Sequence, residues 1–427
     1  MPEYRVLVVG TTSDYIDHIR RNFPGRAVFV TDPGERKKAK EARPNPEEEI
    51  LCQLENPFPV INALRTHLKI CGIQAGGVVC YDCESLELAA TIAGELNLPF
   101  PSVSSICNCR NKFLAGRLWE KAGVPCPEAV AVNSLTDALG FMDRVQAPII
   151  LKPMTGSGSE LVFQCRNESE CFEAFSLLQT RLSRHENIRM YQAGNRGREF
   201  IAERFVQGDE YSCDFILADE KAEIIRIARK IPDPDGLPGT TLTYVLPVSL
   251  PEGSPEPGPI LCKAAHALGL KQTVCMADFI LEKGIPCLLE MAPRPGGDCI
   301  PRIIEKSSGL DMIGLALDFA ERKPLNLPSQ WKKLAGVRFF AKKSGIIRQL
   351  DDSRIKADGR VRESHLKVRA GHQVTLPPDD YDSRILGHVI FSPSQPDDID
   401  HIRTESFELA SKLAISISDQ LYRYTDT

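Results

Sequence analysis

Apolar runs and amphipathic segments alternate along the first hundred residues. The run from Tyr4 to Gly10 is apolar and ends at a glycine, which predicts a buried parallel strand. Spaced apolar positions over residues 14–22 predict a helix, and further elements are expected at 27–30 (strand), 76–79 (strand) and 84–96 (helix). This order predicts an α/β domain of Rossmann-like βαβ units over residues 1–110. The turn after the first strand lacks G-x-G-x-x-G, so we expect no dinucleotide cofactor.

The pattern changes after residue 110. A helix is predicted over 111–122, followed by strands at 148–152 and 161–164 and by two strands within 199–216 around a Gly208-Asp209 turn. Residues 231–259 hold eight prolines and four glycines, so beyond a short run at 241–246 they predict a lid or a surface insertion. A strand at 223–227 and a helix at 260–268 flank this stretch. After residue 332 we expect strands at 337–341, 345–349, 373–376 and 387–391, and a final helix near 406–417.

The stretch ADFILEKGIPCLLEMAPRPGGD, residues 277–298, predicts a β-hairpin with an odd-length loop centred on Gly284. In that register Asp278 and Glu290 face each other on one side of the hairpin. Opposed carboxylates repel unless a cation lies between them, and Mg²⁺ suits two carboxylates plus nucleotide phosphates. An exposed hairpin with solvated acids is the alternative. Arg294 follows four residues after Glu290, and Gly296 and Gly297 allow backbone to approach a ligand.

Two lysines and a small-residue loop are candidates for phosphate binding. Lys112 stands at a helix start, where a cation is unfavourable to the helix dipole unless it serves a ligand or is solvated. Lys152 ends a predicted strand, directly before a loop that offers backbone N–H groups and hydroxyls. The loop consists of Thr155, Gly156, Ser157, Gly158 and Ser159. It is not a Walker A loop, and an ordinary hairpin turn is the alternative.

An adenine nucleotide needs an apolar slot, an acceptor for its 6-amino group and an acceptor for its ribose. Glu203, the Phe205-Val206 pair and Glu210 supply these groups in order. Two surface glutamates are the alternative interpretation of the same residues.

Composition narrows the class of protein. The chain has 427 residues, 42% hydrophobic and 26% charged, with a net charge of −5. These values predict a soluble protein of two or three domains, without a nucleic-acid partner. No early apolar run is long enough for a signal peptide or a membrane span, so we expect a cytoplasmic protein. The 14 cysteines predict reduced thiols, although Cys80, Cys83, Cys107 and Cys109 have spacings that admit a zinc site.

The motifs, taken together and in order, resemble those of ATP-grasp enzymes, within the carboxylate–amine ligase group that includes the L-amino-acid ligases. The matching pieces are NKFLAG (111–116), ILKPMTGSGS (150–159), ERFVQGDEYS (203–212), and DF with EMAPRPGGD (278–298). The resemblance implies an ATP-grasp domain over 111–325 built from two α+β subdomains, with a lid-type subdomain at about 125–205. It also implies a β-rich C-terminal region, residues 326–427, and often a homodimer.

The resemblance assigns a role to each candidate. Lys112, Lys152 and residues 155–159 correspond to phosphate-binding groups, Glu203, Phe205 and Val206 to the adenine contact, and Glu210 to the ribose contact. Asp278 and Glu290 correspond to ligands of Mg²⁺, for which Mn²⁺ is a possible substitute. Arg294 matches the arginine that holds the carboxylate substrate and its acyl-phosphate. Arg302 and Lys230 are expected to add positive charge near it, together with the backbone at Gly296 and Gly297.

One position departs from the family pattern. Ala292 stands where many members have an asparagine that supplies a metal ligand, so either water completes the coordination or only one metal is tightly held, with Asp298 as a candidate replacement. The main hypothesis is an ATP-dependent ligase that joins an amino acid carboxylate to an amine through an acyl-phosphate. The alternatives are an ATP-grasp carboxylase or purine-pathway ligase, and a nucleotide-binding protein that has lost catalysis.

Overall fold

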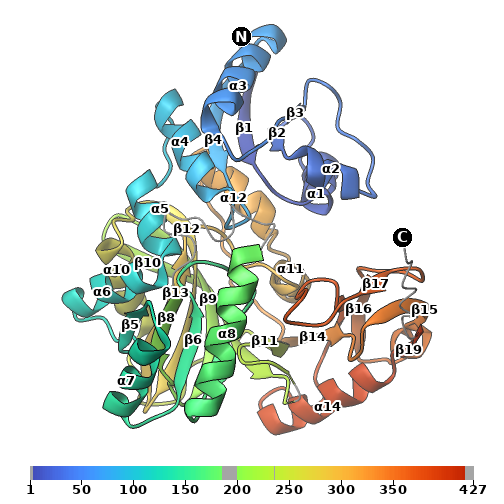
Figure 1. Cartoon of the computed structure of the whole chain (residues 1–427). Helices are drawn as coiled ribbons and strands as arrows, with labels where there is room; N and C mark the ends of the chain where they lie inside the picture. Colours follow the sequence, from blue (N-terminus) through green and yellow to red (C-terminus); the bar gives the residue numbers. More distant parts are fainter. Residues whose placement is uncertain (1–2, 185–199, 235, 419–427) are drawn as a thin grey trace, which may run out of the picture.

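The computed structural model describes residues 3–184, 200–234 and 236–418, arranged as an N-terminal domain above two further sheet-containing parts (Figure 1). The N-terminal sheet is parallel, in the order β3-β2-β1-β4. Its strands are β1 (Glu3–Val9), β2 (Ala27–Thr31), β3 (Glu49–Leu51) and β4 (Ile73–Val79). Its helices are α1 (Ser13–Asn22), α2 (Pro33–Lys38), α3 (Pro57–Cys71), α4 (Leu86–Leu96) and α5 (Val103–Arg110). The predicted Rossmann-like α/β fold is confirmed here.

One helix from much later in the chain completes this domain. Helix α12 (Met312–Ala320) packs its apolar side chains, among them Ile313 and Leu317, against Val6 and Val8 of β1. A Cβ atom on Gly77 of β4 would lie 2.4 Å from the Ala320 carbonyl oxygen, so the close approach requires glycine. Residues 312–320, predicted to belong to the ATP-grasp domain, therefore cover a face of the N-terminal sheet.

A four-stranded antiparallel sheet, ordered β5-β8-β6-β7, forms the second part. It consists of β5 (Ala129–Val132), β6 (Ile149–Pro153), β7 (Phe163–Cys165) and β8 (Phe200–Arg204). Helices α7 (Leu135–Val145) and α8 (Glu168–Arg184) pack on it around a core that includes Phe141, Leu151 and Leu178. These elements occupy the predicted lid-type subdomain, of which residues 185–199 lie outside the described residues.

An eight-stranded antiparallel sheet, ordered β13-β12-β9-β10-β11-β14-β18-β16, forms the centre of the molecule. Five strands precede residue 326: β9 (Asp209–Ala218), β10 (Lys221–Pro232), β11 (Thr241–Leu246), β12 (Thr273–Glu282) and β13 (Ile285–Ala292). Three follow it: β14 (Leu334–Phe340), β16 (Val361–Leu366) and β18 (Ile385–Phe391). The domain boundary predicted at residue 326 thus falls within one continuous sheet. Helices α6 (Lys112–Ala122), α10 (Pro257–Ala267) and α11 (Ile300–Ser308) pack against it.

A small sheet, ordered β17-β15-β19, lies beside the central one near the C-terminus (Figure 1). It contains β15 (Gly345–Asp351), β17 (Gln373–Val374) and β19 (Ala414–Ser418), with helices α13 (Ser353–Lys356) and α14 (Ile399–Ser411) nearby. The final helix predicted near 406–417 is wrong in its limits. It starts at Ile399, after the N-cap Asp398, whose side chain accepts hydrogen bonds from the backbone N–H groups of Asp400 and His401. Alternating Ile415 and Ile417 then belong to β19.

The short run expected at 241–246 is confirmed as β11, which lies fully buried between β10 and β14. Residues 238–241 line the central cavity, residue 235 is outside the described residues, and a lid formed by the rest of 231–259 stays a prediction. Strands β8 and β9, predicted as neighbours around Gly208, belong to different sheets. A Cβ atom on Gly208 would lie 2.3 Å from the Leu281 carbonyl oxygen, which explains the glycine at this crossing.

Candidate functional site

The hairpin of β12 and β13 sets two carboxylates opposite each other. Its turn is shorter than predicted: Glu282 pairs with Ile285, so only Lys283 and Gly284 form the loop, both with positive φ (52° and 84°). A bulge at residue 289 then shifts the register by one, and Asp278 pairs with Glu290. The predicted pairing of the acids is confirmed, and the predicted odd-length loop is wrong.

The two acids line a cavity of about 1100 Å³ that also contacts the four-stranded sheet and the C-terminal strands. One oxygen of Asp278, Oδ1, is buried without a hydrogen-bond partner, and its Oδ2 lies 2.9 Å from the Lys230 Nζ. A buried carboxylate oxygen without a donor is costly, so a ligand is expected there. Two facing carboxylates suit Mg²⁺, whose other ligands are usually water and phosphate oxygens. No cluster of three or more His, Cys, Asp or Glu side chains suited to a metal occurs among the described residues.

Lys230 lies between Asp278, a predicted metal ligand, and Glu210, the predicted ribose contact. Its ammonium contacts Asp278 and also pairs with Glu210, the predicted ribose contact. Burial by itself would lower the pKa of Lys230, but the two carboxylates raise it well above its usual range, so the side chain stays charged. Lys230 therefore holds Asp278 and Glu210 in position, a role that the sequence prediction of a substrate contact did not include.

The two predicted phosphate-binding lysines face the same cavity from different elements. Lys112 begins α6, whose first turn is capped by Asn111, and its Nζ donates to the Gly156 carbonyl oxygen at 3.0 Å. Burial lowers the pKa of Lys112, while Glu290 opposes that shift. This contact explains a lysine at a helix start. Lys152, on β6, forms a 2.6 Å ion pair with Glu203 on the neighbouring strand β8.

The Lys152–Glu203 ion pair involves a residue that was predicted to contact adenine. Glu203 is buried, and one of its oxygens is engaged by Lys152. The N–H of Phe205 donates to the Pro148 carbonyl oxygen at 2.9 Å, and this hydrogen bond joins the end of β8 to the start of β6. Phe205, Val206 and Glu210 all line the cavity, so the predicted nucleotide-binding residues converge. Their individual contacts with a nucleotide stay predictions.

The predicted phosphate loop joins β6 to β7 and all of its five residues, 155–159, line the cavity. Gly156 and Gly158 have φ values of 134° and 68°, and Ser159 follows with 60°. The Ser159 hydroxyl donates to the Gly239 carbonyl oxygen at 3.0 Å, and this contact joins the loop to the turn before β11. A Cβ atom on Gly158 would meet no atom within 4 Å, so the backbone there is open to the cavity.

Arg294 lies just beyond the end of β13 and lines the cavity with Gly297. Its Nε contacts the Cys83 sulfur at 3.1 Å, and its Nη1 donates to the Pro295 carbonyl oxygen at 2.7 Å. A guanidinium keeps its charge at any ordinary pH, so Arg294 is a fixed cation on the side of the two acids.

Two predicted substrate-binding residues are corrected. The Gly296 N–H donates to Asp214 Oδ1 at 2.7 Å, and a Cβ atom there would lie 2.9 Å from Arg226 Nη2. The Asp214–Arg226 pair is fully buried, with a closest contact of 2.5 Å, so Gly296 attaches the Arg294 loop to the central sheet. Arg302 does not line the cavity, because Glu363 and Glu305 hold it at 2.5 Å each. Only Gly297 of the glycine pair is open to a ligand.

Two expectations concern metal ligands. Both carboxylate oxygens of Asp298 have partners, Oδ1 in Arg338 at 3.1 Å and Oδ2 in the Tyr244 hydroxyl at 2.9 Å, and its replacement of the ligand missing at Ala292 stays a prediction. The zinc hypothesis is wrong for the four cysteines, all of which are described and free, since they form no metal-binding cluster. Cys83 contacts Arg294 instead.

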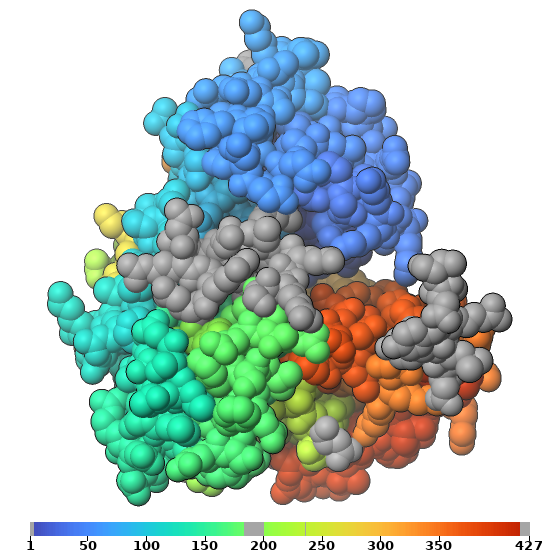
Figure 2. Space-filling model, viewed as in Figure 1, coloured from blue at the N-terminus to red at the C-terminus, as the bar shows by residue number. Residues whose placement is uncertain are grey.

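The sequence interpretation missed one wall of the cavity. Arg338 and Phe340 on β14 line it, together with residues 378–382, 384 and 385 before and at the start of β18, although no catalytic pattern is visible in that part of the sequence. The only local signal in the sequence is Arg338, which stands two residues before Phe340 at the end of a strand. In Figure 2, α8 lies beside the C-terminal part, and an ion pair between Arg181 and Asp379 joins the two.

Comparison with known proteins confirms the predicted resemblance. Residues 145–302 match a family model described as "ATP-grasp domain". An "Uncharacterized protein y4rH" of Sinorhizobium fredii is 28% identical over 306 residues, 71% of this chain and 61% of that protein. The chain thus spans less than two thirds of that relative. An "Alanine--anticapsin ligase" of Bacillus subtilis is 29% identical over 238 residues, 52% of this chain and 49% of that protein.

Among solved structures, an L-amino acid ligase from Bacillus licheniformis superposes with a TM-score of 0.75 at 18% identity. The match covers 98% of this chain and 100% of that one, so it confirms the predicted fold class over nearly the whole chain. No helix in the described part of the chain combines the length and apolarity needed to cross a bilayer.

Proposed function

We propose that this chain, whose residues 145–302 match a model of the ATP-grasp domain, is an ATP-dependent ligase that joins an amino acid or small-peptide carboxylate to an amine. The observation that supports this most is the facing of Asp278 and Glu290 in one cavity with Lys112 and Arg294. That cavity combines a place for a divalent cation with fixed cations for phosphate and carboxylate groups.

The proposed reaction begins with attack of the acid's carboxylate oxygen on the γ-phosphorus of ATP. The bond from γ-phosphorus to the bridging oxygen breaks, ADP leaves and an acyl-phosphate forms. Lys112 and Lys152 neutralise charge on the phosphoryl oxygens, and Arg294 orients the acid. A divalent ion on Asp278 and Glu290 would neutralise further phosphate charge.

The amine then attacks the acyl carbon, and phosphate leaves as the amide forms. Arg294 and Lys112 stabilise the oxyanion of the tetrahedral intermediate. The loop 155–159 and the turn near Gly239, which contact each other through Ser159, limit the entry of water that would hydrolyse the acyl-phosphate. Small-molecule acids and amines are thus the proposed partners, with ATP and Mg²⁺ as requirements.

The test is a phosphate-release screen over pairs of amino acids, followed by mass analysis of the products. We expect ADP and phosphate to form only when an acid and an amine are both present, with a product lighter by one water than the two substrates together. Phosphate release that needs bicarbonate instead of an amino acid would indicate a carboxylase. No ATP turnover with any pair, although nucleotide binds, would indicate a protein that has lost catalysis.

A further inference from the structure

A second pair of cationic side chains lines the cavity on the C-terminal side. Arg338 lies on β14, and Arg384 directly precedes β18. The central carbons of their guanidinium groups lie 4.8 Å and 5.0 Å from the centre of the Phe340 ring, which also lines the cavity. Stacking on an aromatic ring holds a guanidinium in one orientation and leaves its N–H edge available to an acceptor.

The two arginines differ in how their charge is balanced. Asp298 forms an ion pair with Arg338, and the Thr241 carbonyl oxygen accepts a further hydrogen bond from it. Among the described residues Arg384 forms no ion pair. Its Nη2 donates to the Thr240 hydroxyl at 3.2 Å, and its Nε is buried without a hydrogen-bond partner. Arg384 therefore holds uncompensated donor capacity at the wall of the cavity.

The surroundings make this arrangement costly without a ligand. Burial and the nearby Arg338 lower the pKa of Arg384, and the fields of Tyr381 and Asp233 offset this only in part. The Arg384 side chain is only partly buried, but its Nε is buried, and a buried charged donor without an acceptor destabilises the folded protein more than a neutral one does. Such a group is expected where a bound anion supplies the missing acceptor, and a carboxylate fits the planar fork of a guanidinium.

The residues already assigned leave this anion unexplained. Arg294, Lys112 and Lys152 face the two acids and the loop 155–159, where the phosphates and the activated carboxyl group belong in the proposed function. Arg384 is instead held at Thr240, and the adjoining residue Thr241 holds Arg338, so the arginine pair borders the start of β11. Arg294 and Arg384 line the same cavity, so this wall offers a separate place for a second anionic group of a substrate.

We propose that Arg384, positioned by Phe340 and assisted by Arg338, binds a second carboxylate of a substrate, one that is not activated. This inference rests on the proposed ligase function and restricts its substrates. The carboxylate belongs either to the amine substrate, as in an amino acid with a free α-carboxylate, or to a dicarboxylic acid substrate. Arg384 is thus a specificity-determining residue.

The experiment uses the full-length protein and two readouts. Hydroxylamine traps the acyl-phosphate as a hydroxamate and reports activation of the acid without any amino acid acceptor. Peptide formation from the best pair in the phosphate-release screen reports the complete reaction. Each is measured for the wild type, Arg384→Met, Arg384→Lys and the control Arg348→Met, which removes an exposed arginine on β15.

If the acceptor carries the second carboxylate, Arg384→Met raises the KM for the acceptor by about tenfold or more and affects hydroxamate formation far less. The wild type prefers the free acceptor to its carboxamide, and Arg384→Met loses this preference. If the acid carries it, the variant loses the preference for a dicarboxylic over a monocarboxylic acid in the hydroxamate readout. Arg384→Lys, which keeps the charge, has an intermediate KM, and Arg348→Met behaves as wild type in both readouts.

The proposal is overturned if Arg384→Met forms hydroxamate and shows no larger change in any substrate KM than Arg348→Met. It is equally overturned if only the KM for ATP rises, since that would place a phosphate at Arg384. A wild type that forms no hydroxamate with any acid would instead refute the proposed function, so the two failures are distinguishable. If Arg384→Met is inactive in both readouts, the Arg384→Lys comparison decides: unchanged carboxylate preferences with Lys overturn the proposal, and weakened ones support it.

Discussion

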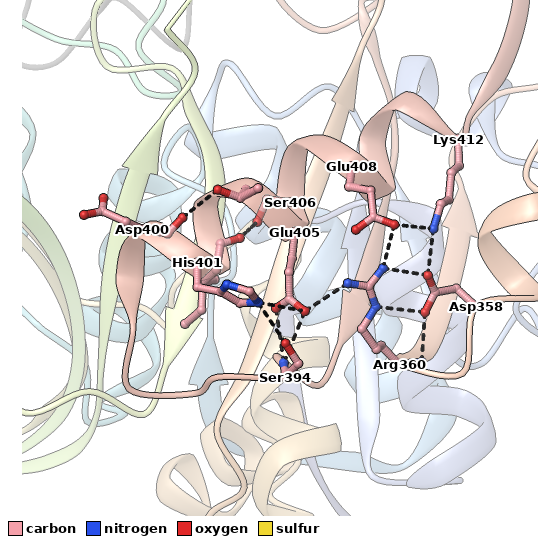
Figure 3. Close-up of polar contacts among 11 residues, drawn as sticks. Asp358, Arg360, Ser394, Asp400, His401, Glu405, Ser406, Glu408 and Lys412 are labelled. Carbon is pink, nitrogen blue, oxygen red and sulfur yellow. Dashed lines mark hydrogen bonds and ion pairs between the residues drawn. The ribbon is translucent and has the colours of Figure 1, made fainter.

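Two clusters of charged side chains in this molecule differ in how completely their charges are paired. The Arg360 cluster, formed by Asp358, Arg360, Glu405, Glu408 and Lys412, joins α14 to the turn before β16 (Figure 3). Arg360 donates to Asp358, Glu405 and Glu408 at 2.7–3.0 Å, and Lys412 donates to Asp358 and Glu408 at 2.8 Å and 2.7 Å. Each charged group there has a partner in the protein.

The central cavity also holds charged side chains, and these are incompletely paired. Asp278 Oδ1 and Arg384 Nε are buried without hydrogen-bond partners, and Glu290 faces another acid across the hairpin. We take this difference to distinguish a cluster that stabilises the fold, in which paired charges attach elements to each other, from one that binds ligands, in which a ligand supplies the missing partners. The following variants test this distinction.

Arg294→Ala is expected to have the largest effect, because it removes the guanidinium that orients the acid and stabilises the oxyanion. We expect product formation to fall by about 1000-fold or more, with the affinity for ATP nearly unchanged. Steady-state rates and nucleotide binding by calorimetry measure the two quantities. Arg294→Lys should recover part of the rate, since it keeps the charge but not the planar fork. Unimpaired turnover by Arg294→Ala would remove this residue from its proposed role.

Asp214→Ala tests a buried pair that is structural although it adjoins the cavity. The change leaves Arg226 buried without its partner and frees the Gly296 N–H. We expect a loss of about 3–5 kcal/mol in the free energy of unfolding, measured by urea denaturation. The double variant Asp214→Leu/Arg226→Met, which replaces both charges by apolar side chains, should recover much of that loss. Nearly equal stability of the single variant and the wild type would contradict the assignment.

Glu290→Gln should separate function from stability. The substitution removes one proposed metal ligand, so we expect about a 100-fold lower rate and a higher Mg²⁺ requirement. It also removes the repulsion with Asp278 in the cross-strand pair, so stability without metal should rise by up to about 1 kcal/mol. Rates across a Mg²⁺ titration and thermal unfolding with chelator give the two values. Lower stability together with an unchanged Mg²⁺ dependence would mean that the acids are not a cation site.

Asp358→Asn should have the smallest effect. Hydrogen bonds from Arg360, and then from Lys412, lower the pKa of the Asp358 carboxyl group below its ordinary range. Its contribution to stability is therefore complete above the unfolded pKa of about 3.9, and it is lost as the pH falls toward the folded value. We expect this variant to lose about 1 kcal/mol or less at pH 7, because the cluster is partly exposed to solvent.

The difference in melting temperature between wild type and Asp358→Asn should stay constant from pH 7 to about pH 4 and shrink as the pH falls further. Ligase activity at pH 7 should be unchanged, in contrast to Glu290→Gln. A large loss of activity in Asp358→Asn would show that paired and unpaired clusters are not distinguished as described.

The sequence alone determined the local elements and the order of the motifs. The period of apolar residues identified the N-terminal strands and helices, and the hairpin of residues 277–292 was recognisable from its apolar runs and Gly284. The acids at 278 and 290 were placed opposite each other, although the turn and the bulge that achieve this were not. These features depend on side-chain periodicity and turn chemistry, which are written in neighbouring residues.

Only the tertiary structure decided which distant strands are neighbours. Strands β8 and β9 follow each other in the chain but enter different sheets, and β14 and β18 join the central sheet from beyond a predicted boundary. Those pairings place Arg338 and Arg384 at the cavity wall. They also allow Arg338 to pair with Asp298, and Glu363 to pair with Arg302. Strand partners are selected by packing between residues far apart in sequence, and no local pattern encodes that choice.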